Sequence, residues 1–437
     1  MSDFDFLVRS TPRDIGVSDG TIVVLGENLS GSAAREIDAT GFTIFPGVID
    51  AHVHFNEPGR TEWEGFATGS RAAAAGGTTT VFDMPLNANP PTIDGPSFDA
   101  KRTAAEEHSL VDFGLWGGLV PGNLDQLETL RDRGVVGLKA FMANSGIDDF
   151  AAVDARVLRE GMERAAALGL IVAVHAESET MTRALTRRAL ENNETSVRAY
   201  LRSRPVAAEL ETIDQALEMA GETGCKVHIV HVSSGSGVRL VAQARKWGVD
   251  VTCETCPHYL VLSEDDMETL GVVAKCAPPL RSAAEQRELR QGLANIETIG
   301  SDHSPSPPEL KERSNFFEVW GGISGCQHLL ALLCEVEELS HTDIARLTSS
   351  GVARRFGLAR KGAIEIGRDA DFSLVAFERE EEITLESLHY RYKQTPYAGR
   401  KTRVRIARTF LRGECIFEQG VFSVRPRGRF VRPTSGS

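Results

Sequence analysis

The chain lacks several features that mark other protein classes. No apolar run among its 437 residues approaches the roughly 18 residues that a membrane-spanning helix needs. Its first residues, MSDFDFLVRS, lack the basic and then apolar order of a signal peptide. Positive charge is not in excess, because 48 basic residues face 61 acidic ones and the formal net charge is −13. This balance argues against nucleic acid or an anionic membrane as a partner.

Disulfide and nucleotide-binding patterns are missing as well. The seven cysteines are odd in number and scattered, so we expect reduced thiols in a cytoplasmic protein. No GxGxxG or Walker loop is present, which leaves nucleotide chemistry without support. The segment CETCPH, residues 253–258, resembles half of a zinc knuckle, but no second cysteine pair follows at suitable spacing. We interpret it as the end of a strand and its loop.

The chain does contain a regular alternation of short apolar runs and longer helical stretches. This alternation predicts an α/β fold, a (β/α)₈ TIM-like barrel built over about 320 residues. The eight predicted strands are Val48–His52, Thr79–Asp83, Phe113–Leu119, Val135–Phe141, Leu170–His175, Lys226–His231, Asp250–Cys253 and Thr298–Asp302. The helices predicted between them include Gly65–Ala75, Asp125–Arg133, Asp154–Leu168, Ala207–Gly221 and Gly237–Trp247.

The two ends of the chain share a different, β-rich texture. Short β-like pieces separated by Gly and Asp occur at Phe6–Arg9, Thr21–Leu25, Phe42–Phe45, Gly362–Ile366, Asp371–Phe377, Arg403–Leu411 and Glu414–Phe417. We therefore expect one small discontinuous β domain, formed by residues 1–46 and 362–437, beside a barrel domain of residues 47–361.

Five of the eight predicted strands end on, or carry, a side chain that can bind a metal ion. These side chains are His52 and His54 on the first strand, Lys139 on the fourth, His175 on the fifth, His231 on the sixth and Asp302 on the eighth. Catalytic groups of such barrels lie at the C-terminal ends of the strands. His52 and His54 are two residues apart, so the pleat puts both on one face. We expect all six to converge at the barrel mouth.

These six groups are suited to two metal ions. Neutral imidazoles favour zinc, and Asp302 adds a hard oxygen ligand. Burial would lower the pKa of Lys139, and a neutral amine can take up CO₂ to become a carbamate that bridges two cations. Two ions about 3.5–4 Å apart can share a hydroxide nucleophile. Asp302 could then pass its proton to a leaving nitrogen.

Each of these residues alone has an ordinary structural interpretation. A histidine at a strand end is more often hydrogen-bonded in the core than a ligand, a lysine in a strand usually reaches solvent, and an aspartate can cap a helix. Their joint occurrence at strand ends of one barrel favours the metal site. His228, three residues before His231, should point away from the barrel interior and be structural.

The ligand series resembles the binuclear centre of the amidohydrolase superfamily, in its cyclic amidase branch. Within that branch the chain is similar to the allantoinases. The matching motifs are HFNEPGRTEWEGF (54–66), MPLNANPPT (84–92), HVSSGSGV (231–238), TCETCPHY (252–259), AKCAPP (274–279), SDHSPSPPE (301–309) and WGGISG (320–325). The resemblance extends to the DADF segment (369–372), over most of the chain, and implies that the small β domain is sandwich-like.

The resemblance also implies a division of roles. His52, His54 and Asp302 would hold one ion, His175 and His231 the other, and carboxylated Lys139 (N6-carboxylysine) would join them. The expected cofactors are two divalent metal ions per subunit, which we expect to be zinc, with cobalt or manganese as alternatives. CO₂ or bicarbonate would supply the carboxyl group on Lys139. A metal-bridging hydroxide would open the hydantoin ring of allantoin to give allantoate in purine degradation, with Asp302 as proton shuttle. Asn87, Cys276 and Ser304 would lie near the substrate, and the assembly would be a homotetramer.

Other members of the branch remain alternatives. Dihydroorotases carry an arginine where this chain has Asn56, and that arginine binds a substrate carboxylate that allantoin lacks. Hydantoinases and dihydropyrimidinases share the metal ligands but differ at HFNEPG and MPLN. A non-catalytic scaffold of the same fold would be expected to lack several ligands, whereas all six are present here.

Overall fold

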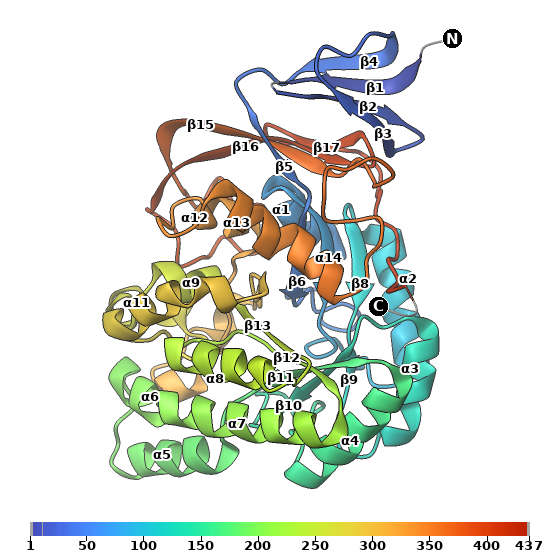
Figure 1. Cartoon of the computed structure of the whole chain (residues 1–437). Helices are drawn as coiled ribbons and strands as arrows, with labels where there is room; N and C mark the ends of the chain where they lie inside the picture. The colour runs from blue at the N-terminus through green and yellow to red at the C-terminus, as the bar shows by residue number, and fades with distance from the viewer. Residues whose placement is uncertain (1–2, 11, 435–437) are drawn as a thin grey trace.

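The computed structural model describes residues 3–10 and 12–434. A barrel forms the larger part, and strands from both ends of the chain form a β region beside it (Figure 1). The outer limits of the two predicted β-domain ranges, residues 1–2 and 435–437, lie outside the described residues, as does residue 11. No described helix is long and apolar enough to cross a membrane.

The barrel consists of parallel strands in chain order, as the alternation predicts. The strands are β6 (Val48–Val53), β7 (Thr78–Asp83), β8 (Asp112–Leu115), β9 (Gly117–Gly118), β10 (Leu138–Phe141), β11 (Ile171–His175), β12 (Lys226–Ile229), β13 (Val251–Thr255) and β14 (Thr298–Ile299). They pair as a three-stranded group, β6 to β8, and a six-stranded group, β9 to β14. Almost every residue in these strands is buried, as expected for a sheet covered on one face and filled on the other.

Short links join the two groups into a closed barrel. At one seam Val53 bridges His303 in parallel, and the His54 amide donates to the His303 carbonyl at 2.7 Å. At the other, the predicted strand Phe113–Leu119 is interrupted at Trp116, so that β8 and β9 are two parts of one strand. The Trp116 indole donates to the Ala51 carbonyl at 3.0 Å, which ties this break to β6. The predicted barrel is thereby confirmed.

Helices follow the strands and surround the barrel (Figure 1). They are α1 (Phe66–Ala75), α2 (Gly95–His108), α3 (Leu127–Arg133), α4 (Ala155–Leu168), α5 (Glu179–Glu191), α6 (Val197–Ser203), α7 (Val206–Thr223), α8 (Gly235–Lys246), α9 (Pro257–Val261), α10 (Glu264–Leu270), α11 (Ala283–Gln291), α12 (Leu329–Leu333), α13 (His341–Ala345) and α14 (Gly351–Arg355). The five predicted helices are present. For example, Asp154 caps α4 by accepting from the Val157 amide, and Gly169 ends it with a φ of 71°.

The β region combines both ends of the chain in two sheets. Residues of the N-terminal part form β1 (Phe4–Arg9), β2 (Asp14–Ser18), β3 (Thr21–Gly26) and β4 (Ala33–Asp38) in the order β3-β2-β1-β4. The other sheet contains β5 (Thr43–Pro46), β15 (Phe372–Glu382), β16 (Lys401–Leu411), β17 (Glu414–Glu418) and β18 (Val421–Phe422) in the order β18-β17-β16-β15-β5. In Figure 1 this second sheet lies between the first and the barrel. The predicted strand Gly362–Ile366 is wrong, because Gly362 turns the chain with a φ of 84°.

Rings from both ends of the chain pack between these sheets. Phe6 stacks on Phe410 at 5.3 Å, and Phe372 stacks on Phe410 at 4.8 Å between ring centroids. β5 pairs with β15 in the register Phe372↔Pro46, immediately before the first barrel strand. Packing therefore couples the chain ends to each other and to the start of the barrel.

A buried ionic cluster joins this region to the barrel. The Lys361 ammonium lies 2.5, 2.9 and 2.6 Å from carboxylate oxygens of Asp112, Asp369 and Asp371. Asp112 begins β8 of the barrel and also contacts the Arg412 guanidinium. The three aspartates are close enough to one another to hold a metal ion, but Lys361, Arg412 and Arg360 already pair with them. The cluster is therefore an ionic link between barrel and β region.

Removing the cation of this cluster should destabilise the fold. We expect Lys361→Met to lower the free energy of unfolding by about 3–5 kcal/mol, because it leaves buried carboxylates without their partner. Urea denaturation followed by circular dichroism measures this change. Lys401→Met, which removes a Lys–Glu pair that is 64% and 60% exposed, is the matched control and should cost under about 1 kcal/mol. Equal losses in the two variants would contradict the role given to the cluster.

Candidate metal centre

The structure brings the predicted ligands to the C-terminal end of the barrel. His52 lies on β6 and His54 just beyond it, Lys139 lies on β10, and His175 is the last residue of β11. His231 follows β12 by two residues and Asp302 follows β14 by three. The parallel pairing of β10 with β11 places Phe141 beside His175.

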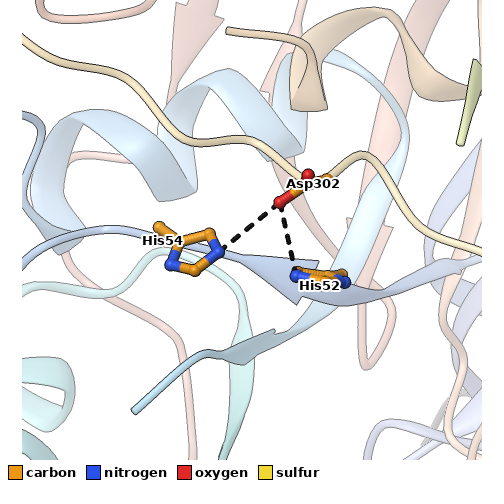
Figure 2. Close-up of side chains that lie close together, drawn as sticks. All are labelled: His52, His54 and Asp302. Carbon is orange, nitrogen blue, oxygen red and sulfur yellow. Dashed lines mark ion pairs between the residues drawn. The ribbon is translucent and has the colours of Figure 1, made fainter. Parts of the chain in front are cut away.

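His52, His54 and Asp302 form what we call the first half-site. Oδ1 of Asp302 lies 3.3 Å from Nε2 of His52 and 3.5 Å from Nε2 of His54 (Figure 2). Two ligands bound to one tetrahedral zinc ion lie about 3.3 Å apart, given metal–ligand lengths near 2.0–2.1 Å. The two distances to Asp302 match this spacing, and all three donor atoms lie within 4.8 Å of one another.

His175 and His231 form the second half-site. Nδ1 of His175 lies 3.0 Å from Nε2 of His231, so one nitrogen of each ring is available to the same predicted ion. The His231 ring also lies 5.5 Å from the His52 ring, which sets the two half-sites side by side. Burial lowers the pKa of both His175 and His231, which favours the neutral imidazoles that bind metal.

Lys139 lies beneath these rings with its amine out of contact with water. The side chain is fully buried, and its Nζ has no hydrogen-bond partner among the described residues. Nζ lies 4.8 Å from the centre of the Phe141 ring, which stacks on His175 at 4.5 Å. Burial lowers the pKa of Lys139 to about 7, against the opposing effect of Asp302 and Glu254. A large fraction of this amine is therefore neutral near pH 7.

Asp302 is the ionised member of the cluster. Burial acts to raise its pKa, but the charge of His52 and the hydrogen bond and charge of His54 outweigh burial and hold the pKa well below its usual range. Its side chain remains 15% exposed toward the cavity. Asp302 can therefore bind a cation and still reach a molecule in the cavity.

Sequence reasoning missed the groups that hold the histidines from behind. Oε1 of Glu254 lies 2.7 Å from Nδ1 of His52, and Oε2 of Glu177 lies 2.9 Å from Nε2 of His175. The Asn87 amide lies 3.2 Å from Nδ1 of His54. Such partners fix the tautomer and the orientation of a ligating imidazole. The only signal in the sequence was that Glu254 and Glu177 also lie at or just past strand ends.

Four residues of the site adopt left-handed backbone conformations that the sequence did not reveal. The φ angles are 65° at Asn56, 67° at Asn87, 39° at His231 and 47° at Asp302. This region is uncommon for residues other than glycine, although asparagine, aspartate and histidine adopt it more often than most. Backbone strain of this kind is found at functional sites, and here it turns two predicted ligands inward.

A small cavity of about 80 Å³ lies over the ligands. Its lining includes the predicted substrate-contacting residues Asn87, Cys276 and Ser304. It also includes Asn144, Ser145, Trp320, Gly321 and Gly322, of which sequence reasoning missed the first two. A larger cavity of about 800 Å³ lies elsewhere, around the residues that precede β10 and β11, and contains none of the six ligands. Volume alone is therefore a poor guide to this site.

The segment WGGISG contributes one wall of the cavity through Trp320, Gly321 and Gly322. A Cβ atom at Gly322 would lie 2.1 Å from the Ser304 carbonyl oxygen, so only glycine allows this approach. Two buried lysines hold the segment: Lys275 donates to the Val319 carbonyl at 2.5 Å and Lys311 to the Gly322 carbonyl at 2.9 Å. Asn56, by contrast, is not among the residues that line the cavity, and its amide donates to the Pro305 carbonyl at 3.4 Å.

The donor set fits divalent cations. It combines neutral imidazoles, one carboxylate and a buried amine without a partner, and no arginine or free ammonium of the described residues pairs with Asp302. Nitrogen and oxygen donors of this kind suit zinc and its neighbours in the periodic table.

Comparison with known proteins places this geometry in a family. Residues 43–416 match the Amidohydrolase family. The chain is 54% identical to an allantoinase of Rubrobacter xylanophilus, over 99% of this chain and 98% of that protein. It is 50% identical to an allantoinase of Deinococcus radiodurans, over 97% and 95% respectively.

Solved structures agree with this assignment. An L-hydantoinase (dihydropyrimidinase) from Arthrobacter aurescens superposes with a TM-score of 0.95 at 34% identity, covering 98% of this chain and 100% of that one. A dihydropyrimidinase from Brevibacillus agri superposes with a TM-score of 0.91 at 28% identity, covering all of both chains. With the family match, the full-length relatives and the ligand cluster in agreement, the chain belongs to the amidohydrolase family of metal-dependent hydrolases.

Proposed function

We propose that this protein hydrolyses the hydantoin ring amide of allantoin to give allantoate, a step of purine (ureide) degradation. The observation that supports this choice over other cyclic amides is the 54% identity to an allantoinase along almost the whole chain. The hydantoinase with the same fold is only 34% identical. The cavity over the ligand cluster is the place where the ring would bind.

The proposed cofactors are two divalent ions per subunit, with zinc first and cobalt or manganese as alternatives. The first half-site would hold one ion, the second half-site the other, and Lys139 would bridge them as a carbamate. The neutral Nζ adds to CO₂, which forms an N–C bond, releases one proton and leaves an anion with two oxygens. When bound, divalent ions polarise a carbonyl oxygen and lower the pKa of water to near 7.

Asp302 is the proposed proton shuttle. Its carboxylate is ionised and can therefore accept the proton of the attacking water, and it would return that proton to the ring nitrogen that leaves. Oδ1 faces His52 and His54, so the carboxylate is held in place while its exposed edge faces the cavity.

Asn87, Cys276 and Ser304 are the proposed substrate contacts. The Asn87 amide lies 3.5 Å from the Ser304 hydroxyl, so these two polar groups share one wall of the cavity. Burial raises the pKa of the Cys276 thiol, which therefore remains neutral and would act as a weak donor rather than a nucleophile.

Two further properties belong to the same proposal. We infer a cytoplasmic enzyme, in agreement with seven cysteines that are all unpaired. The family resemblance supports a homotetramer with a small-molecule substrate. The alternatives are a hydantoinase or dihydropyrimidinase, a dihydroorotase-like enzyme, or a scaffold without activity.

A substrate panel tests the proposed activity. The purified protein, assayed with allantoin, hydantoin, dihydrouracil and dihydroorotate, should show its highest kcat/KM with allantoin. Zinc content measured on the same preparation distinguishes an enzyme from a non-catalytic scaffold, because a scaffold is expected to bind less than about one ion per chain. Faster turnover of hydantoin than of allantoin would reassign the enzyme within the family.

Replacement of the shuttle carboxylate should stop the reaction without unfolding the protein. Asp302→Asn keeps an oxygen ligand but cannot accept the proton, so we expect kcat to fall at least about 100-fold. Metal content and the circular dichroism spectrum should be measured alongside the rate. A kcat close to that of the unmodified protein would remove Asp302 from this role.

Loss of the buried amine should affect the metal as well as the rate. We expect Lys139→Ala to lose both bound metal and activity, with partial recovery of both when acetate or propionate supplies the missing carboxylate. Lys246→Ala, at an exposed lysine on α8, is the matched control and should change neither. Unchanged metal content in Lys139→Ala would rule out the carbamate.

A further inference from the structure

A buried carboxylate stands behind one histidine of each half-site. Glu254 contacts His52 at 2.7 Å, and Glu177 contacts His175 at 2.9 Å. In both rings the other nitrogen faces the proposed metal position. Both carboxylates are almost fully buried, with exposures of 1% and 0%. Since water does not screen them, the charge near each carboxylate acts directly on the ion that its histidine would bind.

The charge of Glu254 is not cancelled by a cation. Among the described residues its ion-pair partners are two imidazoles, His52 and His228, the second at 3.9 Å. His228 is held by Thr252, whose hydroxyl lies 2.7 Å from its Nδ1. Burial lowers the pKa of His228, which favours its neutral form. No arginine or lysine of the described residues forms an ion pair with Glu254, so its negative charge faces the first half-site, which also contains Asp302.

The charge of Glu177 is cancelled. The Arg204 guanidinium forms a direct ion pair with Oε2 of Glu177, the same oxygen that faces His175. Arg281, which pairs with the Glu209 carboxylate at 3.8 Å, donates to the Arg204 carbonyl and so holds the residue that caps α6. Behind His175 there is thus a neutral pair instead of a free anion.

We propose that Glu254 and Glu177 are positioning residues that make the metal centre unequal, so that the first half-site holds its ion more tightly than the second. Glu254 strengthens His52 as a ligand through its uncompensated charge. Glu177 orients His175, but its pairing with Arg204 removes most of that strengthening. The inference rests on the proposed two-ion centre.

Metal release from the zinc-loaded protein tests the inequality. Excess chelator is added, and zinc leaving the protein is followed with a chromogenic dye and counted against protein concentration. We expect two phases of one ion each, with rates at least about tenfold apart. His231→Asn removes a direct ligand of the second half-site, so it should abolish the fast phase and assign it to that half-site.

Removing the charge of Glu254 should affect one phase only. Glu254→Gln keeps the size and the hydrogen-bond acceptor but loses the charge, so we expect the slow phase to accelerate by about 10–100-fold. The fast phase should change less than about twofold. An unchanged slow phase would overturn the role of Glu254.

Variants of Arg204 distinguish an electrostatic role of the Glu177–Arg204 pair from a role in the fold alone. Arg204→Met leaves Glu177 without its cation, and we expect the fast phase to slow. Glu177→Gln leaves Arg204 without its anion, and the fast phase should accelerate. The double variant restores a neutral pair, so its rate should return close to that of the unmodified protein. If both Arg204→Met and the double variant released the second ion faster, Arg204 would only be supporting the fold.

The outcomes separate this inference from the function on which it rests. An unmodified protein that binds no ion would overturn the proposed metal centre together with the inference. Two ions that leave in a single phase would overturn the inference and leave the proposed function intact. Circular dichroism of each variant confirms folding, and the two phases of the unmodified protein remain decisive if Arg204→Met does not fold.

Discussion

The exclusion of water from the barrel rim is the constraint on which the site depends. Loss of hydration disfavours charged forms, and it lowers the pKa of His54, His175 and His231, which leaves these imidazoles in the form that binds metal. Asp302 responds differently because His52 and His54 offset the cost of its charge. Burial therefore favours the neutral form of these three imidazoles before any cation arrives, whereas the contacts of Asp302 with its neighbours keep that carboxylate ionised.

The barrel could be predicted from the sequence because its strands are buried on both faces and read as short apolar runs between helices. The predicted strands beginning at Val48, Thr79 and Leu170 agree with β6, β7 and β11 to within one residue. The long connections could not be predicted as well. Helices α5, α6 and α9 to α12 lie in segments whose structure depends on packing against the barrel, and the break in the third strand depends on Trp116 reaching the Ala51 carbonyl on another strand.

The predicted ligands could be identified in the sequence for a related reason. Histidine or aspartate at the end of an apolar strand conflicts with its surroundings, and such conflicts mark functional positions. Glu254 and Glu177 gave a weaker signal, since an acidic residue near a strand end has many ordinary explanations and its partner lies far away in the chain. The inward turn of His231 and Asp302 depends on positive φ angles, and the identity of a residue does not predict its φ angle. The sequence thus indicated which side chains come together at the barrel mouth. It did not indicate the hydrogen-bond partners and backbone conformations that hold them there.

The buried lysines show why partners, and not burial alone, decide what such a residue can do. Lys361 has three carboxylates around it, and their charges outweigh burial and raise its pKa. Lys101 has one carboxylate at 2.6 Å, whereas Lys275 and Lys311 donate to backbone carbonyls. Among the lysines that the structure describes, Lys139 is the one with a buried Nζ and no partner. Burial lowers the pKa of Lys139 and of Lys275 alike to about 7, so the pKa does not distinguish them. The absence of a hydrogen-bond partner at Nζ is what separates Lys139 from the structural lysines, and it agrees with the carbamate proposed above.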